Sequence, residues 1–231
     1  MVYMEDGKMM IDIIYEDNHV LVALKKVNVL SQSDGSTTPD MLTLLKKYLK
    51  EKYHKEGNVY LGLVHRLDKE VGGIMVFAKT SKAAKRLSQN IQDHKFYKEY
   101  LAVVKGNLTS SATFKDYLKR IDYKSYVTNQ KDGKEAILSY ETLATNQDST
   151  LVKINLKTGR HHQIRVQFAT RHHPLLGDKK YGQKGKYPLA LYAYKLSFYH
   201  PITKELLTFT SIPKEGYFKS YQKSLDIISV C

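Results

Sequence analysis

The sequence has 231 residues, 42% of them apolar and 26% charged, so the chain is long and apolar enough to bury a sizeable core. The 37 lysines and arginines outnumber the 23 acidic residues, and the resulting net charge of +14 favours an anionic partner. The sequence lacks a long apolar run and a basic, apolar leader, so we expect neither a membrane span nor a secretory signal. The single cysteine, Cys231, excludes an internal disulfide and a cysteine-based zinc site, and we expect a cytoplasmic protein.

The first third of the chain predicts a hairpin followed by a helix. Ile11–Tyr15 and Val20–Lys25 are short apolar runs separated by a polar turn, which is typical of two paired strands. In the helix expected over 39–53, apolar residues recur at helical spacing and lysines occupy the other face. The segment Thr38–Asp40 is predicted to supply its N-cap, a proline at the first helical position and an acid in the first turn.

The next segments predict two strands around a polar loop, and then a helix. Val59–Val64 and Ile74–Lys79 are expected to be strands, and His65–Gly73 between them is a polar loop that ends in two glycines. A helix capped by Thr80 is predicted over Ser81–Gln92.

The rest of the chain is mostly predicted strand. The segment 107–135 is polar and weakly patterned, and we expect it to be an insertion or a mobile loop, while residues 160–171 are expected to form a helix. Strands are predicted over Tyr100–Val104, Ala136–Ala144, Leu151–Leu156, Ala190–Phe198 and Leu206–Thr210. Because strands outnumber helices and most links have hairpin length, the sequence predicts an α+β fold. We expect a mixed, largely antiparallel β-sheet with flanking helices and loops, in a single domain over 1–231.

One predicted loop presents a carboxylate beside an arginine. The segment VHRLDKEVGG at 64–73 places Asp68 two residues after Arg66, between two apolar strands, where catalytic groups tend to lie. Only 6 residues of the chain are arginine, so lysine fills most surface positions and arginine is expected where a planar, bidentate donor is needed. The alternative is that Asp68 caps a turn and the glycine pair permits a tight bend.

Two further segments carry side chains that can bind a planar or an anionic group. Tyr100 lies at the head of the KEYLAVVKG segment, either as a residue that packs the strand or as a platform for a base. The segment TGRHHQIR at 158–165 forms either a solvated face or a surface that binds a polyanion at a helix N-terminus. Its histidines have no carboxylate at a recognised ligand spacing, so we do not expect a metal site.

Asp68, Arg165 and Tyr100 form a coherent set on a basic protein. An ionised carboxylate in a desolvated pocket needs a charge partner, and a bidentate arginine is the best one available. A tyrosine can stack on a planar base that has been taken out of an RNA stack. These requirements are compatible with chemistry on a nucleobase, but the spacing of the residues does not name the reaction.

Several blocks in the same order resemble the RluA-type pseudouridine synthases. They are HRLDKEVGGIMVFAKT at 65–80, KEYLAVVKG at 98–106, LKTGRHHQIRVQF and HPLLGDKKYG within 156–182, and LYAYKLSFYHP at 191–201. The resemblance spans about residues 11–213 and implies a pseudouridine synthase-like fold. It also implies an enzyme that isomerises uridine to pseudouridine in structured rRNA or tRNA, by flipping the base and without a metal or organic cofactor.

The resemblance implies a role for each matching residue. Asp68 matches the essential catalytic aspartate, Tyr100 the tyrosine that stacks on the base, and Arg165 the arginine that pairs with the aspartate. The expected RNA-binding residues are Arg66, which is associated with entry into the RNA stack, Lys69 in the same block, and Arg160, His162 and Gln163. Whether Asp68 acts as a nucleophile or as a base stays open.

The chain departs from the family pattern in two places. Val71-Gly72-Gly73 replaces the usual Thr-Ser-Gly, and Leu24–Asn28 keeps only the lysine of an Asn-Lys-Pro-x-Gly segment, although Asn28 can adopt the left-handed conformation of that glycine. The departures leave open an RNA-binding protein whose catalysis is dispensable. A hydrolase that uses Asp68 as a nucleophile would make poor use of the positive charge. Since the pattern begins near Ile11, we expect no separate S4 RNA-binding domain, and we expect a monomer.

Overall fold

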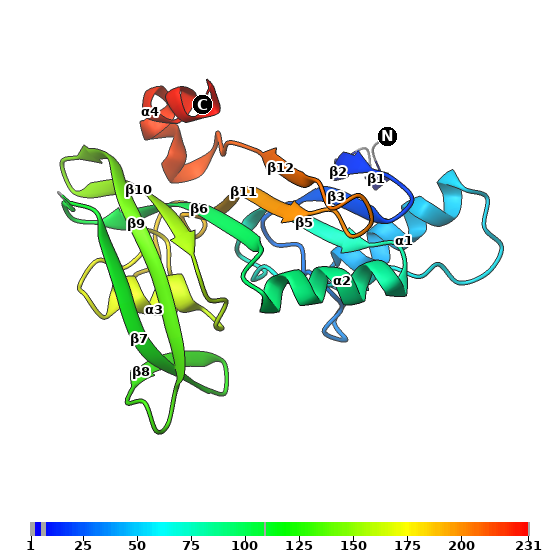
Figure 1. The fold of residues 1–231 in the computed structure, drawn as a ribbon. Coiled ribbons are helices and arrows are strands. Elements are labelled where there is room, and N and C mark those ends of the chain that lie inside the picture. The colour runs from blue at the N-terminus through cyan, green and yellow to red at the C-terminus, as the bar shows by residue number, and fades with distance from the viewer. Residues whose placement is uncertain (1–2, 6–7, 109, 231) are drawn as a thin grey trace. The chain divides into compact units, whose positions relative to one another are not determined.

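The structure is a computed structural model that describes all residues except 1–2, 6–7, 109 and 231. The chain divides into two compact units (Figure 1). The first unit comprises Met1–Phe96 and Lys195–Thr210, and the second comprises Tyr97–Tyr194 and Ser211–Cys231. The single catalytic domain over 1–231 stays a prediction.

The sheet of the first unit is built from antiparallel strand pairs. Its strands are β1 (Tyr3–Glu5), β2 (Lys8–Glu16), β3 (Val20–Lys25), β4 (Gly62–Leu63), β5 (Gly72–Ala78), β12 (Leu206–Thr210) and the Lys195–Tyr199 part of β11 (Leu191–Tyr199). The β2–β3 hairpin and the β11–β12 pair confirm two predictions. The strand expected over 59–64 is shorter, with only Gly62 and Leu63 paired, to the end of β5.

Both predicted helices of the first unit are present. In α2 (Ser81–Gln92), the Thr80 hydroxyl accepts a hydrogen bond from the Ala83 amide at 3.1 Å, which confirms the predicted cap. In α1 (Met41–Lys52), the cap is instead Asp40, whose carboxylate accepts from the Thr43 amide at 3.0 Å. The prediction of Thr38 as the N-cap was therefore wrong, because the backbone at Asp40 is still extended.

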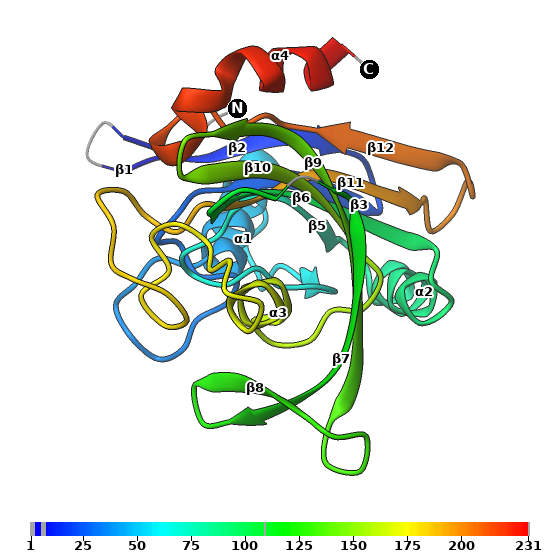
Figure 2. The same ribbon diagram turned by 90° about the vertical axis from the view of Figure 1, so that its left-hand side faces the viewer.

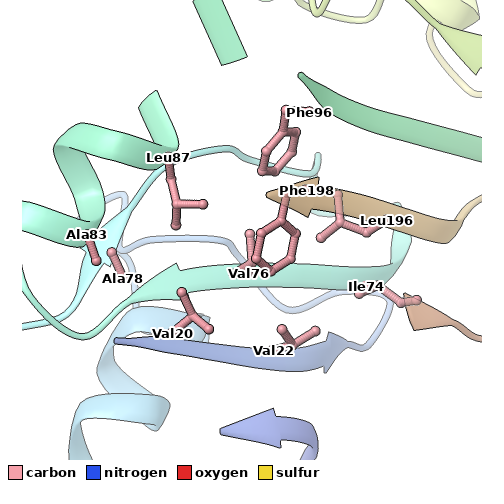
Figure 3. Packing of buried hydrophobic residues seen from close by; sticks show 10 residues of the cluster. All are labelled: Val20, Val22, Ile74, Val76, Ala78, Ala83, Leu87, Phe96, Leu196 and Phe198. Carbon is pink, nitrogen blue, oxygen red and sulfur yellow. The ribbon is translucent and has the colours of Figure 1, made fainter. Parts of the chain in front are cut away.

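A core of aliphatic and aromatic side chains joins the strands of the first unit to α2. Figure 3 shows Leu87 of α2 directed towards Val76 of β5 and Phe198 of β11. All three side chains are completely buried, and such packing is the main source of stability for a short helix. Because β3 and β5 meet along this core, β5 is firmly held, and the loop that precedes β5 is fixed at that end.

The second unit contains a long antiparallel sheet in the order β6-β10-β9-β7-β8. The bounds are β6 (Phe96–Lys105), β7 (Ala112–Ile121), β8 (Lys124–Thr128), β9 (Lys134–Asn146) and β10 (Ser149–Leu156). The mobile loop expected over 107–135 was wrong, because β7 and β8 occupy most of this segment, while an insertion there stays a prediction. Both strands are largely exposed, so backbone pairing holds them without an apolar pattern in the sequence.

Helices cover both faces of this second sheet (Figure 2). On one face, η1 (Gly216–Tyr221) and α4 (Gln222–Val230) pack on Leu101 and Val103 of β6. On the other face, Phe168 of α3 (Gln163–Ala169) contacts Phe114 and Tyr140, with ring centroids 5.1 and 5.3 Å apart. No helix among the described residues is both long and apolar enough to cross a membrane.

Candidate active site

The loop that carries Asp68 lies in the first unit and is anchored through the backbone of the residue before it. The buried Ser31 hydroxyl accepts a hydrogen bond from the Leu67 amide at 3.0 Å and donates one to the Leu67 carbonyl at 2.7 Å. A buried side chain that satisfies both backbone groups of one residue leaves that residue little freedom. Ser31 therefore helps to position Asp68 through the backbone of Leu67.

A second anchor holds the residue after Asp68. The Asn28 amide donates to the Lys69 carbonyl at 2.8 Å, and Asn28 has a φ of 69°. This confirms the left-handed conformation predicted for Asn28. A tight turn closes the loop, because the Val71 amide donates to the Asp68 carbonyl at 3.0 Å. The turn considered for Asp68 is therefore present, and this hydrogen bond involves the backbone of Asp68.

Lys25 provides a buried cation beneath this loop. Its side chain is 1% exposed, and its ammonium donates to the carbonyls of Lys26, Val29 and Lys69 at 3.1, 2.6 and 3.2 Å. Burial lowers the pKa of Lys25 from 10.5 to about 7, and the negative charge of Asp68 acts in the opposite direction. Three carbonyl acceptors match the three donors of an ammonium, so these hydrogen bonds favour the charged form of Lys25.

The glycine pair after the loop belongs to a strand. The loop predicted over 65–73 ends at Val71, because Gly72 and Gly73 are the first residues of β5. Gly73 pairs with Lys25 and has a φ of 131°, a conformation that side chains rarely adopt. Val71 is 2% exposed, so an apolar side chain occupies a buried place where the family pattern has a hydroxyl.

The remaining predicted residues of this loop point into solvent. Arg66 is exposed, and Lys69 is exposed with its ammonium 3.2 Å from the Thr38 hydroxyl. Both side chains are therefore accessible from solvent.

Arg165 lies in the second unit, on α3, where it forms a buried ion pair with Asp178. The guanidinium Nε and Nη2 atoms donate to the two carboxylate oxygens at 2.8 and 2.7 Å, and the two residues are 1% and 0% exposed. Burial alone would raise the pKa of Asp178, but the hydrogen bonds and charge of Arg165 outweigh it and hold the pKa below 3.8. The sequence analysis had missed Asp178, although it lies in the GDKKYG block.

A chain of contacts, a cation–π contact followed by a hydrogen bond, continues from this ion pair to His162. The Arg165 guanidinium lies over the Tyr181 ring, 5.5 Å from its centroid, and the Tyr181 hydroxyl is 2.9 Å from His162 Nδ1. That hydroxyl also accepts a hydrogen bond from the Ser125 amide at 2.7 Å. Burial and the nearby Arg165 charge lower the pKa of His162 from 6.5 to about 3, so the imidazole is neutral at physiological pH.

The helix predicted over 160–171 is shorter, because left-handed residues bound it. His162 at its start and His172 after its end have φ values of 53° and 64°. Gly159 and Arg160 are exposed, whereas all residues from Gln163 to Phe168 are buried, so only the start of the 158–165 segment is a solvated face. Gln163 Oε1 accepts from the Thr158 hydroxyl and the Arg160 amide at 2.7 and 3.0 Å, which fixes the approach to α3.

Asp116 on β7 fixes the C-terminal part of α3 to the sheet. Its carboxylate accepts from Gln167 Nε2 at 2.7 Å and from both terminal nitrogens of Arg171 at 2.9 and 3.1 Å. The Arg171 guanidinium also lies 4.0 Å from the centroid of the Phe114 ring. These contacts hold the backbone of the helix that carries Arg165.

Tyr100 lies on the face of the second sheet that α3 covers. It pairs with Ile154 of β10, which pairs with Tyr140 of β9, and directly opposed residues point to the same face. Tyr100 is 6% exposed. The packing role considered for Tyr100 is therefore compatible with its position, and the base-stacking role stays a prediction.

The structure brings some of the predicted site residues together within each unit. Asp68, Arg66 and Lys69 share the loop of the first unit, while the second unit contains Tyr100, Arg160, His162, Gln163 and Arg165. The ion pair of Asp68 with Arg165 joins residues of different units and stays a prediction. In the described part of the chain, no three His, Cys, Asp or Glu side chains gather as a group that could hold a metal ion.

Comparisons with known proteins agree with this arrangement. Residues 19–170 match the family model for RNA pseudouridylate synthase. The chain is 37% identical to an RNA pseudouridine synthase of Aquifex aeolicus, over 94% of this chain and 73% of that protein. It is 33% identical to the ribosomal large subunit pseudouridine synthase D of Buchnera aphidicola, over 89% of this chain and 70% of that protein.

Solved structures show the same fold. The human RNA pseudouridylate synthase domain containing 4 aligns with a TM-score of 0.75, with 21% identity over 93% of this chain and 92% of that chain. The α+β prediction is thus confirmed. Together the fold and the matches define an enzyme that modifies RNA. The chain belongs to the RNA pseudouridylate synthase family, whose members isomerise uridine to pseudouridine in RNA.

Proposed function

We propose that this chain isomerises uridine in structured rRNA or tRNA with Asp68 as the catalytic carboxylate, by flipping the target base. The observation that supports the proposal is the construction of the Asp68 loop. Ser31 and Asn28 anchor the residues on either side of Asp68, and Lys25 lies buried below. A carboxylate held in this way needs little reorganisation to reach a reacting atom.

The reaction needs a group that acts at the sugar while the base is detached and turned. The bond between C1′ and N1 breaks and a bond between C1′ and C5 forms. The hydrogen on C5 leaves to solvent as a proton, and N1 takes up a proton in its place. Asp68 would act either as a nucleophile at the sugar or as a base there. No atoms are gained or lost overall, so the proposal includes neither a metal nor an organic cofactor.

We assign the other residues according to their exposure. Arg66 is proposed to enter the RNA stack, and Lys69 and Arg160 to contact phosphates, since all three are exposed. Tyr100 is proposed to stack on the flipped base, and Arg165 to pair with Asp68. His162 and Gln163 are buried, so they would support RNA binding by holding the segment before α3.

Large-subunit rRNA is the first substrate to test, because several relatives are named for that activity. We also propose that the enzyme works as a monomer in the cytoplasm, where its net charge of +14 would attract RNA irrespective of sequence. Sedimentation of the purified enzyme with and without RNA would measure its oligomeric state.

The isomerisation can be measured by the release of tritium from [5-³H]uridine-labelled RNA taken from cells that lack the protein. Wild type is expected to release tritium, and Asp68→Asn to release none while binding RNA with nearly unchanged affinity. Glu70→Gln is a matched control, since Glu70 lies on the same loop and has no proposed role in catalysis. Equal release by Asp68→Asn and wild type would overturn the assignment of Asp68.

A second outcome would favour the non-catalytic alternative. If wild type binds rRNA and tRNA in a salt-sensitive manner but releases no tritium from either, the chain acts as an RNA-binding protein. Val71→Thr and Gly72→Ser, which restore the family pattern in this loop, would then show whether the departure at 71–72 is the cause.

A further inference from the structure

Lys98 is a partly buried cation that the proposed reaction does not use. It lies on β6, two residues before Tyr100, in the second unit. In the ranges that the structure describes, its ammonium has neither a hydrogen bond nor an ion pair. Burial lowers the pKa of Lys98 below 10.5, and no opposing charge offsets that effect.

An unpaired ammonium is costly to bury. Proteins normally compensate such a charge with an acid or with carbonyl oxygens, as they do for Lys25 in the first unit. A lysine without such compensation is characteristic of a site that is completed by an anionic ligand. Lys98 therefore differs in kind from the many exposed lysines of this chain.

Lys98 lies on the same face of the sheet as Tyr100, the residue proposed to stack on the target base. Alternate residues of a strand point to the same face, so Lys98 and Tyr100 share the face that α3 covers, about 6.8 Å apart along the strand. The ammonium lies against Gly159, where an added Cβ atom would be 3.0 Å from Lys98 Nζ. The missing side chain at Gly159 thus leaves room for the ammonium at the approach to α3.

We propose that Lys98 binds a backbone phosphate of the RNA next to the target uridine. This inference rests on the proposed function, in which the target base stacks on Tyr100. A phosphate supplies the full negative charge that the site lacks, and an aromatic platform beside a cation is a common arrangement for single-stranded nucleic acid. Lys98 is therefore a substrate-binding residue in addition to those that the family resemblance implied.

The salt dependence of RNA binding tests the proposal. The loss of one phosphate contact should reduce the slope of log K against log salt by about 0.7 to 0.9. We therefore expect Lys98→Met to show this smaller slope and a higher Kd at low salt, while Lys98→Arg keeps the wild-type slope. Gly159→Ala keeps the charge but displaces the ammonium, and it should weaken binding as well.

Lys153→Met is the matched control. Lys153 lies on the neighbouring strand β10, opposite Leu101 and so on the other face of the sheet, and it is paired with Glu141 at 2.6 Å. Lys153→Met should leave unchanged both the slope of log K against log salt and the Kd. Lys98→Met should also unfold at the same or a higher urea concentration than wild type, since an unpaired, partly buried charge is replaced by an apolar side chain of similar length.

The outcomes separate this proposal from the proposed function. A wild-type slope in Lys98→Met, or loss of stability in that variant with unchanged RNA affinity, would overturn the phosphate contact and indicate a structural role. Tritium release by wild type tests the isomerisation independently. Release together with an unchanged slope would leave the function supported and remove Lys98 from the binding site.

Discussion

Asp178 holds Arg165 through both of its carboxylate oxygens, at 2.8 and 2.7 Å, and neither residue is more than 1% exposed. A guanidinium fixed by two parallel hydrogen bonds can present its remaining nitrogen in only a narrow range of directions. Asp178 is therefore a positioning residue for Arg165, and its removal should affect the fold and the turnover together.

Asp178→Asn should destabilise the protein by about 3 to 5 kcal/mol, because it removes the carboxylate from a buried ion pair. Turnover measured by tritium release should fall as well. Urea unfolding measures the first effect. Asp93→Asn, at the exposed end of α2, is the control and should change stability by less than about 0.5 kcal/mol. Equal stability of Asp178→Asn and wild type would contradict the role of the ion pair.

Ser31→Ala should loosen the Asp68 loop. The variant loses two buried hydrogen bonds to Leu67, at a cost of about 1 to 3 kcal/mol, and its turnover should fall while RNA affinity changes little. Single-turnover tritium release and filter binding measure the two effects. Ser33→Ala, on an exposed stretch of the same segment, should behave as wild type. Unchanged turnover in Ser31→Ala would show that this anchor does not matter for catalysis.

Glu16 predicts a specific loss of stability in acid. Burial opposes its ionisation, but hydrogen bonds from Lys52, Lys79, Tyr53 and Tyr48 outweigh burial and lower its pKa from 4.5 to about 2. A lowered carboxyl pKa stabilises the fold above pH 4.5, and this contribution is lost as the pH falls towards 2. The difference in unfolding free energy between wild type and Glu16→Gln should be on the order of 2 kcal/mol at neutral pH and shrink over that interval. A difference that does not vary with pH would refute the assignment.

His162 should stay neutral over the range in which ordinary histidines titrate. With a pKa of about 3, its imidazole shifts in NMR should not change between pH 5 and 8. Below pH 6.5, His162 is protonated in the unfolded chain but stays neutral in the folded protein. This residue therefore reduces stability as the pH falls below 6.5. A titration of His162 between pH 5 and 8 would show that burial and the charge of Arg165 do not keep it neutral.

Features determined by neighbouring residues could be predicted from the sequence. The β2–β3 hairpin and α2 with its Thr80 cap involve hydrogen bonds between residues only a few positions apart. The left-handed Asn28 follows from the side chain itself. Motif resemblance placed Asp68, Tyr100 and Arg165 among the candidate residues because the matching blocks are short and continuous.

Features that depend on distant residues could be found only in the tertiary structure. Pairing with β9 makes 112–121 a strand although its own pattern is weak, and left-handed histidines shorten α3. The partners that position the site, Ser31 for Leu67 and Asp178 for Arg165, lie 36 and 13 residues away from them. The sequence alone does not distinguish one serine or aspartate from another. Folding buries some of these side chains, and only a buried polar group needs a hydrogen bond or an ion pair in place of water.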